Sequence, residues 1–434
     1  MVGAPGPNHF TVWVRASGSF AVDLEYSTDP TFERVFKGSS AAARRENENC
    51  VVLQATGLLP ATRYYYRLKF AGEIDRYQPL PYHTTTAPAG PSSFTVAFGS
   101  CCRIQFDRNQ PIFDVVRRLE PNMFFWLGDN IYADTDDPGA LSELYTRQRV
   151  VESLEPLLRS TPQLAIWDDH DFGYNDSDGL SRFKQDSLRQ FRSYWANPAS
   201  GSDGAPGIWF RQSYGGVDFF FLDGRYHRDP SVAPDGPAKT MLGATQKAWL
   251  KSELLKSRAP FKVLVSGGGW SSAEKLDGGD SWAAYQHERD EIFDFIRDRQ
   301  IGGVLCISGD SHMGELNCIP RSATGGYDIY DMCSSPLAQM PAVKQLAQVP
   351  EMRVRDVWSR SVNVGFLRFE MGARPRLTYT LHDVLGEPIW DPLVLTPEDL
   401  RNGARSWDRL ADPEELKRLE RYKAGRGYYG TDPA

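Results

Sequence analysis

The sequence has no apolar run long enough to cross a membrane and no large excess of charge of one sign. No stretch of about 18 consecutive apolar residues occurs, so no transmembrane helix is expected. The net charge of −7 gives no reason to expect nucleic acid or an anionic membrane as a partner. Residues 1–20 show no charged segment followed by an apolar one, so no signal peptide is expected there. This predicts either a cytoplasmic protein or a mature or trimmed chain.

Cysteine and histidine are scarce, with 6 and 7 residues among 434. Cys101 and Cys102 are adjacent, and the other cysteines lack the paired spacing of a structural zinc site or a disulfide framework. The hydrophobic content of 41% and the charged content of 24% are ordinary for a globular protein. A chain of this length is typical of about two to three domains.

The first 88 residues have the pattern of an all-β domain. Residues 10–14 and 21–26 alternate between apolar and polar side chains, as half-buried strands do. Residues 51–68 resemble the fibronectin type III signature around its E and F strands. We therefore expect a small Ig- or fibronectin-like β-sandwich over residues 1–88, followed by a linker and a second domain at 92–434.

From residue 94 onward, short apolar runs alternate with longer segments that carry an apolar stripe at helical spacing. This order predicts an α/β (α+β) domain in which two β-sheets pack together and helices cover them, making four layers. Strands are expected at 94–99, 123–127, 163–167, 217–222, 261–265, 304–308, 327–332, 364–371 and 377–381. Helices are expected at 112–119, 187–195, 245–255 and 286–299, with one more in the C-terminal tail at 413–422.

Five of the expected strands end in side chains that can bind a metal ion. One carboxylate at a strand end is usually a turn or cap residue, but five such ends are hard to explain that way. In α/β sheets the carboxyl ends of the strands form the edge where ligands bind. The residues that follow these strands are Ser100-Cys101-Cys102, Gly128-Asp129 with Tyr132, Asp168-Asp169-His170-Asp171 with Asn175, Asp223-Gly224-Arg225, and Gly309-Asp310-Ser311-His312.

The donor types indicate a hard or borderline metal ion. Carboxylates crowded at one edge repel each other unless a cation neutralises them. Oxygen donors mixed with imidazole and a thiolate argue against a structural zinc site bound only by sulfur. Two ions that share a bridging carboxylate would use this many ligands, and such pairs stabilise both oxygens of an in-line displacement at phosphorus.

Taken in order, these motifs resemble the PhoD-like alkaline phosphatases and phosphodiesterases of the calcineurin-like metallophosphoesterase superfamily. The motifs are Ser-Cys, Gly-Asp-x-Ile-Tyr, Trp-Asp-Asp-His-Asp, Leu-Asp-x-Arg and Ser-Gly-Asp-x-His, and the resemblance covers residues 94–383. It implies a two-sheet sandwich flanked by helices behind an N-terminal β domain. It also implies that a metal-bound hydroxide at a dinuclear site hydrolyses a phosphate ester.

The resemblance implies a Fe3+ site and a Ca2+ site that share Asp129. Tyr132 and Cys101 would bind the iron, with Cys102 as the alternative thiolate. No histidine follows the strand at 261–265, which favours calcium in the second site, although Zn2+, Mn2+ or Mg2+ are alternatives in one site. The expected metal ligands are Cys101, Asp129, Tyr132, Asp169, Asn175, Asp223, Asp310 and His312.

The expected catalytic residues are His170, Asp129 and Arg225. His170 would either donate a proton to the leaving group or stabilise the transition state. Arg225, Arg228 and Asn175 are expected to bind the substrate, with a structural ion pair as the alternative for Arg228. Loops 172–215 and 226–243 are long enough to act as lids. The aromatic residues that could line the entrance, or else simply pack, are Phe172, Tyr174, Trp195, Trp209 and Trp270.

Two other functions stay open. One is a phospholipase-D-like or nucleotide-directed phosphodiesterase, and the other is a fibronectin-type binding protein whose phosphatase domain has decayed. Retention of every motif argues against decay. The expected partner is a small phosphate-ester substrate, and no nucleic-acid binding surface is evident. The resemblance implies a periplasmic or secreted protein, whereas the oligomeric state and the preference for monoesters or diesters are not predicted.

Overall fold

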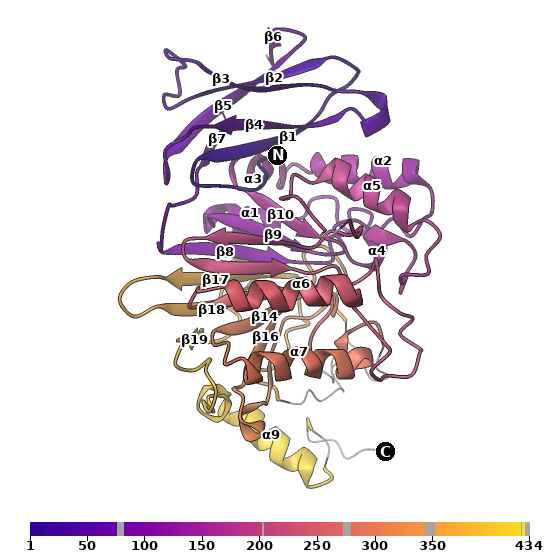
Figure 1. The fold of residues 1–434 in the computed structure, drawn as a ribbon, viewed down its shortest axis with the longest axis vertical. Helices are drawn as coiled ribbons and strands as arrows, with labels where there is room; N and C mark the ends of the chain where they lie inside the picture. The colour runs from indigo at the N-terminus through magenta and orange to yellow at the C-terminus, as the bar shows by residue number, and fades with distance from the viewer. Residues whose placement is uncertain (76–81, 202–203, 272–278, 343–351, 427, 430–434) are drawn as a thin grey trace.

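The computed structural model describes residues 1–75, 82–201, 204–271, 279–342, 352–426 and 428–429. Figure 1 shows a small N-terminal β region stacked on a larger α/β body, with the C-terminal helix at the opposite end. None of the helices that the structure describes has the length and apolar character needed to cross a membrane.

Two small antiparallel sheets make up the N-terminal region. Their strands alternate between buried and exposed positions, and the buried side chains of both sheets share one apolar core. The all-β expectation is confirmed, whereas an Ig- or fibronectin-like identity stays a prediction. One sheet pairs β1 (His9–Arg15) with β4 (Cys50–Thr56); the other contains β2 (Ala21–Ser27), β3 (Phe36–Ala42), β5 (Arg63–Phe70), β6 (Glu73–Ile74) and β7 (Tyr82–Thr85).

Backbone hydrogen bonds join this region to the α/β body. The Val2 amide donates to the Leu158 carbonyl at 2.7 Å, and the Gln163 amide donates to the Val2 carbonyl at 3.0 Å. The Trp13 indole adds a bond of 2.7 Å to the Ser193 carbonyl. The N-terminal region is therefore fixed beside the start of the strand that begins at Gln163.

The body contains two six-stranded sheets that pack face to face. Aromatic side chains fill the space between them: the ring centroids of Phe125 and Phe219 are 5.0 Å apart, and those of Phe125 and Phe221 are 4.9 Å apart. The first sheet has the order β10 (Gln163–Ile166), β9 (Met123–Leu127), β8 (Phe94–Gly99), β17 (Asn363–Glu370), β18 (Arg376–Asp383) and β19 (Leu393–Leu395). The second has the order β11 (Phe210–Tyr214), β12 (Val217–Phe221), β13 (Lys262–Val265), β14 (Val304–Ser308), β16 (Ile329–Cys333) and β15 (Glu315–Ile319).

Helices cover the outer faces of the sheets, which completes the expected four layers (Figure 1). In α7 (Gln286–Asp298), Ile292, Phe293 and Ile296 are buried on one face, and the Phe293 ring packs on Trp270 at 5.5 Å. The other α-helices are α1 (Ile112–Arg118), α2 (Pro138–Arg149), α3 (Glu155–Ser160), α4 (Asp169–Phe172), α5 (Lys184–Tyr194), α6 (Gly243–Lys256), α8 (Trp407–Leu410) and α9 (Pro413–Lys423). Short 3-10 helices lie at Arg45–Asn47, Trp282–Tyr285 and Ser322–Thr324.

Strands β8, β9 and β10 are parallel, as are β12, β13, β14 and β16. Strands β9 and β14 are buried along their whole length, which explains their continuous apolar sequence. The carboxyl ends of the two sheets meet: the Asp310 amide, after β14, donates to Ser100 Oγ, after β8, at 3.0 Å, and the Leu337 amide, after β16, donates to the Ser100 carbonyl at 2.8 Å. Side chains that follow β8, β9, β10 and β14 therefore converge.

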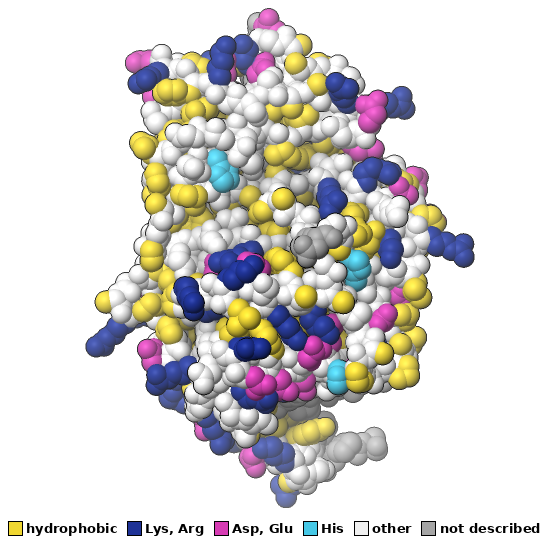
Figure 2. All heavy atoms as spheres, in the orientation of Figure 1, with side chains coloured by type: hydrophobic (Ala, Val, Ile, Leu, Met, Phe, Trp, Pro, Cys, Tyr) yellow, Lys and Arg dark blue, Asp and Glu magenta, His cyan; other side chains and the backbone are white. Residues whose placement is uncertain are grey.

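Acidic and basic side chains are interspersed over the face of the molecule shown in Figure 2. Apolar side chains are scattered between them rather than gathered in one broad area. This face therefore presents no wide surface of one charge.

Candidate metal centre

The residues at the converging strand ends have an unusual backbone. The φ angle is 59° at Cys101, 51° at Asp129, 67° at Asp310 and 56° at His312, all in the left-handed region. Gly128, before Asp129, has φ 95°, and an added Cβ there would come within 2.6 Å of the Asp168 side chain. Left-handed residues with a side chain cost roughly 1–2 kcal/mol each and cluster at functional sites. The backbone therefore turns sharply after each strand and presents these side chains at one place.

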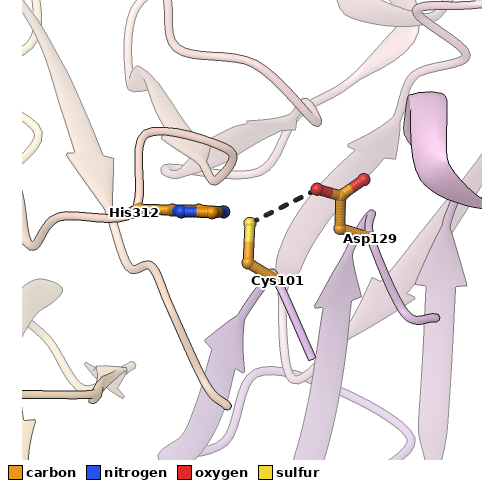
Figure 3. A group of neighbouring side chains, drawn as sticks. All are labelled: Cys101, Asp129 and His312. Carbon is orange, nitrogen blue, oxygen red and sulfur yellow. Dashed lines mark hydrogen bonds between the residues drawn. The ribbon is translucent and has the colours of Figure 1, made fainter. Parts of the chain in front are cut away.

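The first candidate group contains Cys101, Asp129 and His312, whose donor atoms all lie within 4.8 Å of one another. Figure 3 shows the Cys101 side chain between the other two, and its Sγ donates to Asp129 Oδ2 at 3.5 Å. The Tyr132 hydroxyl joins this group, because it lies 2.9 Å from His312 Nε2. Thiolate, carboxylate, imidazole and phenolate donors thus meet where the resemblance predicted iron.

The second candidate group contains Asp129, Asp169 and His170, again within 4.8 Å. Asp129 belongs to both groups, as a bridging ligand would. Its Oδ1 is buried and has no hydrogen-bond partner among the residues that the structure describes. A buried carboxylate oxygen without a hydrogen bond destabilises the folded protein unless a cation or a hydrogen-bond donor pairs with it. The arrangement of Asp129 therefore fits a metal ion.

The electrostatics of these groups also fit a bound cation. Burial, together with the charges of Asp169 and Cys101, raises the pKa of Asp129 well above its usual value. Burial and the charge of Asp310 raise the pKa of the Cys101 thiol to about 12. Burial and the charge of Asp129 likewise raise the pKa of Tyr132. Only a positive charge at the centre would let these groups ionise together.

Asp134 holds His170 in a defined orientation. Nδ1 of His170 lies 2.6 Å from Asp134 Oδ1, and the Ala133 amide donates to the His170 carbonyl at 3.2 Å. The imidazole packs on the Tyr132 ring, with the centroids 4.1 Å apart. Burial lowers the pKa of His170, but the Asp134 hydrogen bond and the charge of Asp169 outweigh it, so the pKa is raised. In the sequence, only the place of Asp134 five residues after Asp129 points to this role, which was not predicted.

Arg225 is a buried counter-ion rather than an open cation. It is fully buried, forms ion pairs with Asp168 and Asp280, and reaches Asp169 Oδ1 at 3.5 Å. Burial opposes ionisation of Asp169, but Arg225 holds the pKa of that carboxyl below its usual value. For Asp168, burial outweighs the effect of Arg225 and raises the pKa to about 7.

Arg228 has the ion-pair role that the sequence offered as its alternative. It is 3% exposed, its Nη2 lies 2.5 Å from Asp280 Oδ1, and its Nε donates to the Tyr285 hydroxyl at 2.8 Å. Both guanidinium groups are buried and paired with carboxylates, and the phosphate contact expected of Arg225 and Arg228 stays a prediction.

Asp223 is a member of neither candidate group. Its oxygens accept hydrogen bonds from the Trp167 indole at 2.8 Å and from the backbone amides of Ile208, Arg225 and Tyr226, each at 3.0 Å. Asp223 therefore shapes the turn after β12, and its expected role as a metal ligand stays a prediction.

Asn175 is exposed on the turn after α4. The next residue, Asp176, donates its amide to Asp169 Oδ2 at 2.7 Å. Its carboxylate forms a third acidic group with Asp169 and Asp280. Around Asp169 the structure thus brings in Asp176, which was not among the predicted site residues.

The aromatic residues of the expected lids mostly pack in the interior. Phe172, Trp195, Trp209 and Trp270 are buried, whereas Tyr174 is 52% exposed. Packing, the alternative offered for these residues, therefore applies to four of the five. Residues 202–203 of the first loop lie outside the described part of the chain.

Comparison with known proteins gives consistent matches along the chain. The model of the PhoD-like phosphatase family matches residues 96–353, and that of the PhoD-like phosphatase N-terminal domain matches residues 1–88. Alkaline phosphatase D of Bacillus subtilis (strain 168) is 25% identical over an alignment of 342 residues, and the match covers 67% of this chain. The match spans 58% of the length of that curated relative.

Two solved structures share the fold. A structure of PhoD has a TM-score of 0.74 at 18% identity and covers 91% of this chain and 88% of its own. A purple acid phosphatase from yellow lupin (Lupinus luteus) seeds has a TM-score of 0.64 at 12% identity and covers 91% of this chain and 73% of its own. The expected fold class is thereby confirmed.

Proposed function

The chain belongs to the PhoD-like phosphatase family, and from that premise we propose that it hydrolyses small phosphate esters with the help of bound metal ions. The observation that carries the proposal is the pair of candidate ligand groups that share Asp129. A shared carboxylate suits two ions held side by side, which is how metal pairs act on a phosphoryl group.

We propose Fe3+ at the group of Cys101, Asp129, Tyr132 and His312, because thiolate and phenolate donors suit a ferric ion better than calcium. Asp310, which follows the same strand as His312, completes the ligand set. The second ion would be held by Asp129 and Asp169, whose oxygen donors favour Ca2+. Zn2+, Mn2+ or Mg2+ are the alternatives in one site. When bound, such ions supply Lewis-acid charge and activate water for attack on phosphorus.

The protein's own groups have separate tasks in this proposal. Asp134 engages Nδ1 of His170, which leaves Nε2 to donate a proton to the departing alcohol. Arg225 neutralises the carboxylates behind Asp169 and so keeps that side chain directed at the centre. The rigid, left-handed turns hold the ligands in place before substrate arrives.

We also propose that residues 1–88 act as a separate β domain in front of a catalytic domain at 92–434. Their two sheets have an apolar core distinct from that of the body, which supports the division. Family resemblance favours a periplasmic or secreted location, which fractionation of expressing cells would test.

Metal analysis of the wild-type protein and Asp129→Asn tests the proposal. The asparagine keeps the shape and the tolerance for a left-handed backbone, but it removes the charge shared by both groups. We expect the variant to lose bound metal and at least about a hundredfold in activity, since metal ligands act directly on the transition state. Asp136→Asn, an exposed neighbour in the same loop, is the matched control. Wild-type protein without metal, or an active Asp129→Asn, would contradict the site.

A panel of chromogenic monoesters, diesters and nucleotides separates the remaining alternatives. Hydrolysis of monoesters supports the phosphatase, whereas activity confined to diesters or nucleotides supports the phosphodiesterase. Protein that binds metal but turns over no ester in the panel would point to the decayed, non-enzymatic alternative.

A further inference from the structure

Arg103 is an exposed arginine beside the candidate metal centre, two residues after Cys101. Its guanidinium carbon lies 5.4 Å from the centroid of the Tyr132 ring. The same tyrosine contacts His312 through its hydroxyl at 2.9 Å and His170 through its ring at 4.1 Å. Because Tyr132 is buried and Arg103 is exposed, the guanidinium covers this cluster from the solvent side.

The loop that carries Arg103 is fixed to the site by its backbone. The Arg103 amide donates to the Ala338 carbonyl at 2.9 Å, and its carbonyl accepts from the Phe106 amide at 3.0 Å. Gln105 Nε2 donates to the Tyr132 carbonyl at 2.8 Å, which ties the loop to the turn that bears Tyr132. The base of the Arg103 side chain thus has a defined position beside the turn that bears Tyr132.

The charge of Arg103 is available to a ligand. No carboxylate in the part of the chain that the structure describes forms an ion pair with it. Arg225 and Arg228, in contrast, are buried and neutralised by Asp168 and Asp280. A guanidinium matches two phosphate oxygens at once, so an exposed arginine at the edge of a phosphoester site suits an anionic substrate.

We propose that Arg103 binds the phosphoryl oxygens of the substrate on the solvent side and thereby favours monoesters over diesters. A monoester at alkaline pH carries two negative charges on its phosphoryl group, whereas a diester carries one and fills a further position with an ester group. The inference rests on the proposed function and adds a preference for one class of ester.

The test compares Arg103→Gln with Arg103→Lys and with Arg108→Gln. Arg108 is an exposed arginine of the same loop that lines a separate surface hollow with Arg117 and Arg147, so it is the matched control for loss of charge. The measurements are metal content, the Ki of inorganic phosphate, and kcat and KM on nitrophenyl phosphate and bis(nitrophenyl) phosphate.

For Arg103→Gln we expect the phosphate Ki and the monoester KM to rise about tenfold, which corresponds to about 1.4 kcal/mol. The diester KM should change much less, and metal content should stay at the wild-type level. The phosphate Ki and the monoester KM of Arg103→Lys should lie between those of the wild type and Arg103→Gln, because lysine keeps the positive charge but cannot donate two parallel hydrogen bonds. Arg108→Gln should match the wild type.

Two results would overturn the proposal: a phosphate Ki in Arg103→Gln equal to that of Arg108→Gln, or equal losses on both esters together with lost metal. Equal losses on both esters together with lost metal would show that Arg103 supports the metal centre structurally, through its contact with Tyr132. Calorimetric titration of inorganic phosphate needs no turnover, so it decides the role of Arg103 even if the wild type hydrolyses neither ester. A wild-type protein that hydrolyses neither ester would count against the proposed function rather than against the role of Arg103.

Discussion

Replacing Arg225 by Met should destabilise the protein by about 3–5 kcal/mol after metal has been removed, because it leaves buried carboxylates without their counter-ion. Arg225 is fully buried, forms two-pronged contacts with Asp280, and pairs with Asp168. Its distance of 3.5 Å to Asp169 Oδ1 adds a weaker contact. Methionine fills much of the same apolar volume, so the loss reflects charge more than a cavity.

An exposed ion pair provides the comparison for the stability effect of the buried Arg225. Arg189 and Asp186 form an ion pair of 2.8 Å, but their side chains are 57% and 40% exposed. Exposed pairs contribute about 0–1 kcal/mol, so Arg189→Met should scarcely change stability. The double variant Arg225→Met, Asp280→Asn should recover part of the loss of Arg225→Met, because it removes one of the stranded charges.

Urea unfolding of the chelated proteins, followed by tryptophan fluorescence, measures the difference. We expect the midpoint of Arg225→Met to fall clearly below those of the wild type and Arg189→Met. Equal midpoints for the two arginine variants would refute the counter-ion role. A variant that unfolds like the wild type but has a raised KM would instead restore Arg225 as a substrate contact.

Four further tests concern Asp168, Tyr132, His170 and Asp134. Burial raises the pKa of Asp168 from its usual 3.8 to about 7 in the folded protein. The protonated side chain therefore contributes fully to the stability of the folded state below about pH 4, and this stabilisation is lost as the pH rises through 7. Urea midpoints of chelated protein should therefore fall over that range, and metal should flatten the slope; a rising slope contradicts this. Tyr132→Phe should remove the visible absorption band of iron-loaded protein at an unchanged unfolding midpoint, and a surviving band argues against a ferric phenolate. His170→Asn should slow alkyl phosphates about a hundredfold and nitrophenyl phosphate much less, because a poor leaving group needs the proton most. Asp134→Asn should show a weaker form of that bias, and equal losses on both esters would contradict it.

The sequence predicted those elements whose burial leaves a simple pattern. Strand β9 is buried at all five positions and reads Met-Phe-Phe-Trp-Leu, so its end at Gly128 was plain. Helix α2 escaped prediction because Ser142, Gln148 and Arg149 are buried within it and blur the apolar stripe. Strand β15 escaped for a similar reason, since its buried positions include Glu315.

The residues of the candidate site likewise divide into those that the sequence predicts and those that it does not. Cys101, Asp129 and His312 could be proposed because each follows a strand whose end the sequence marks. The partners of Arg225 could not, because Asp280 lies 55 residues further along the chain in a glycine-containing loop that no local pattern places. Interactions between distant loops depend on the packed structure, and that is where the buried arginine cluster arises.

The left-handed turns at the metal centre also limit how such a site can change during evolution. Asp, Asn, His and Gly tolerate that backbone best, whereas β-branched residues are strongly disfavoured there. Two requirements therefore limit which residues are tolerated at Asp129 and Asp310. While metal is bound, the side chain must supply a donor atom; without metal, only the left-handed backbone restricts the choice. A lineage that gave up the metal would be expected to drift toward asparagine or glycine at these positions rather than alanine or valine. Glycine at a former ligand position would thus be a trace of a centre that has been abandoned.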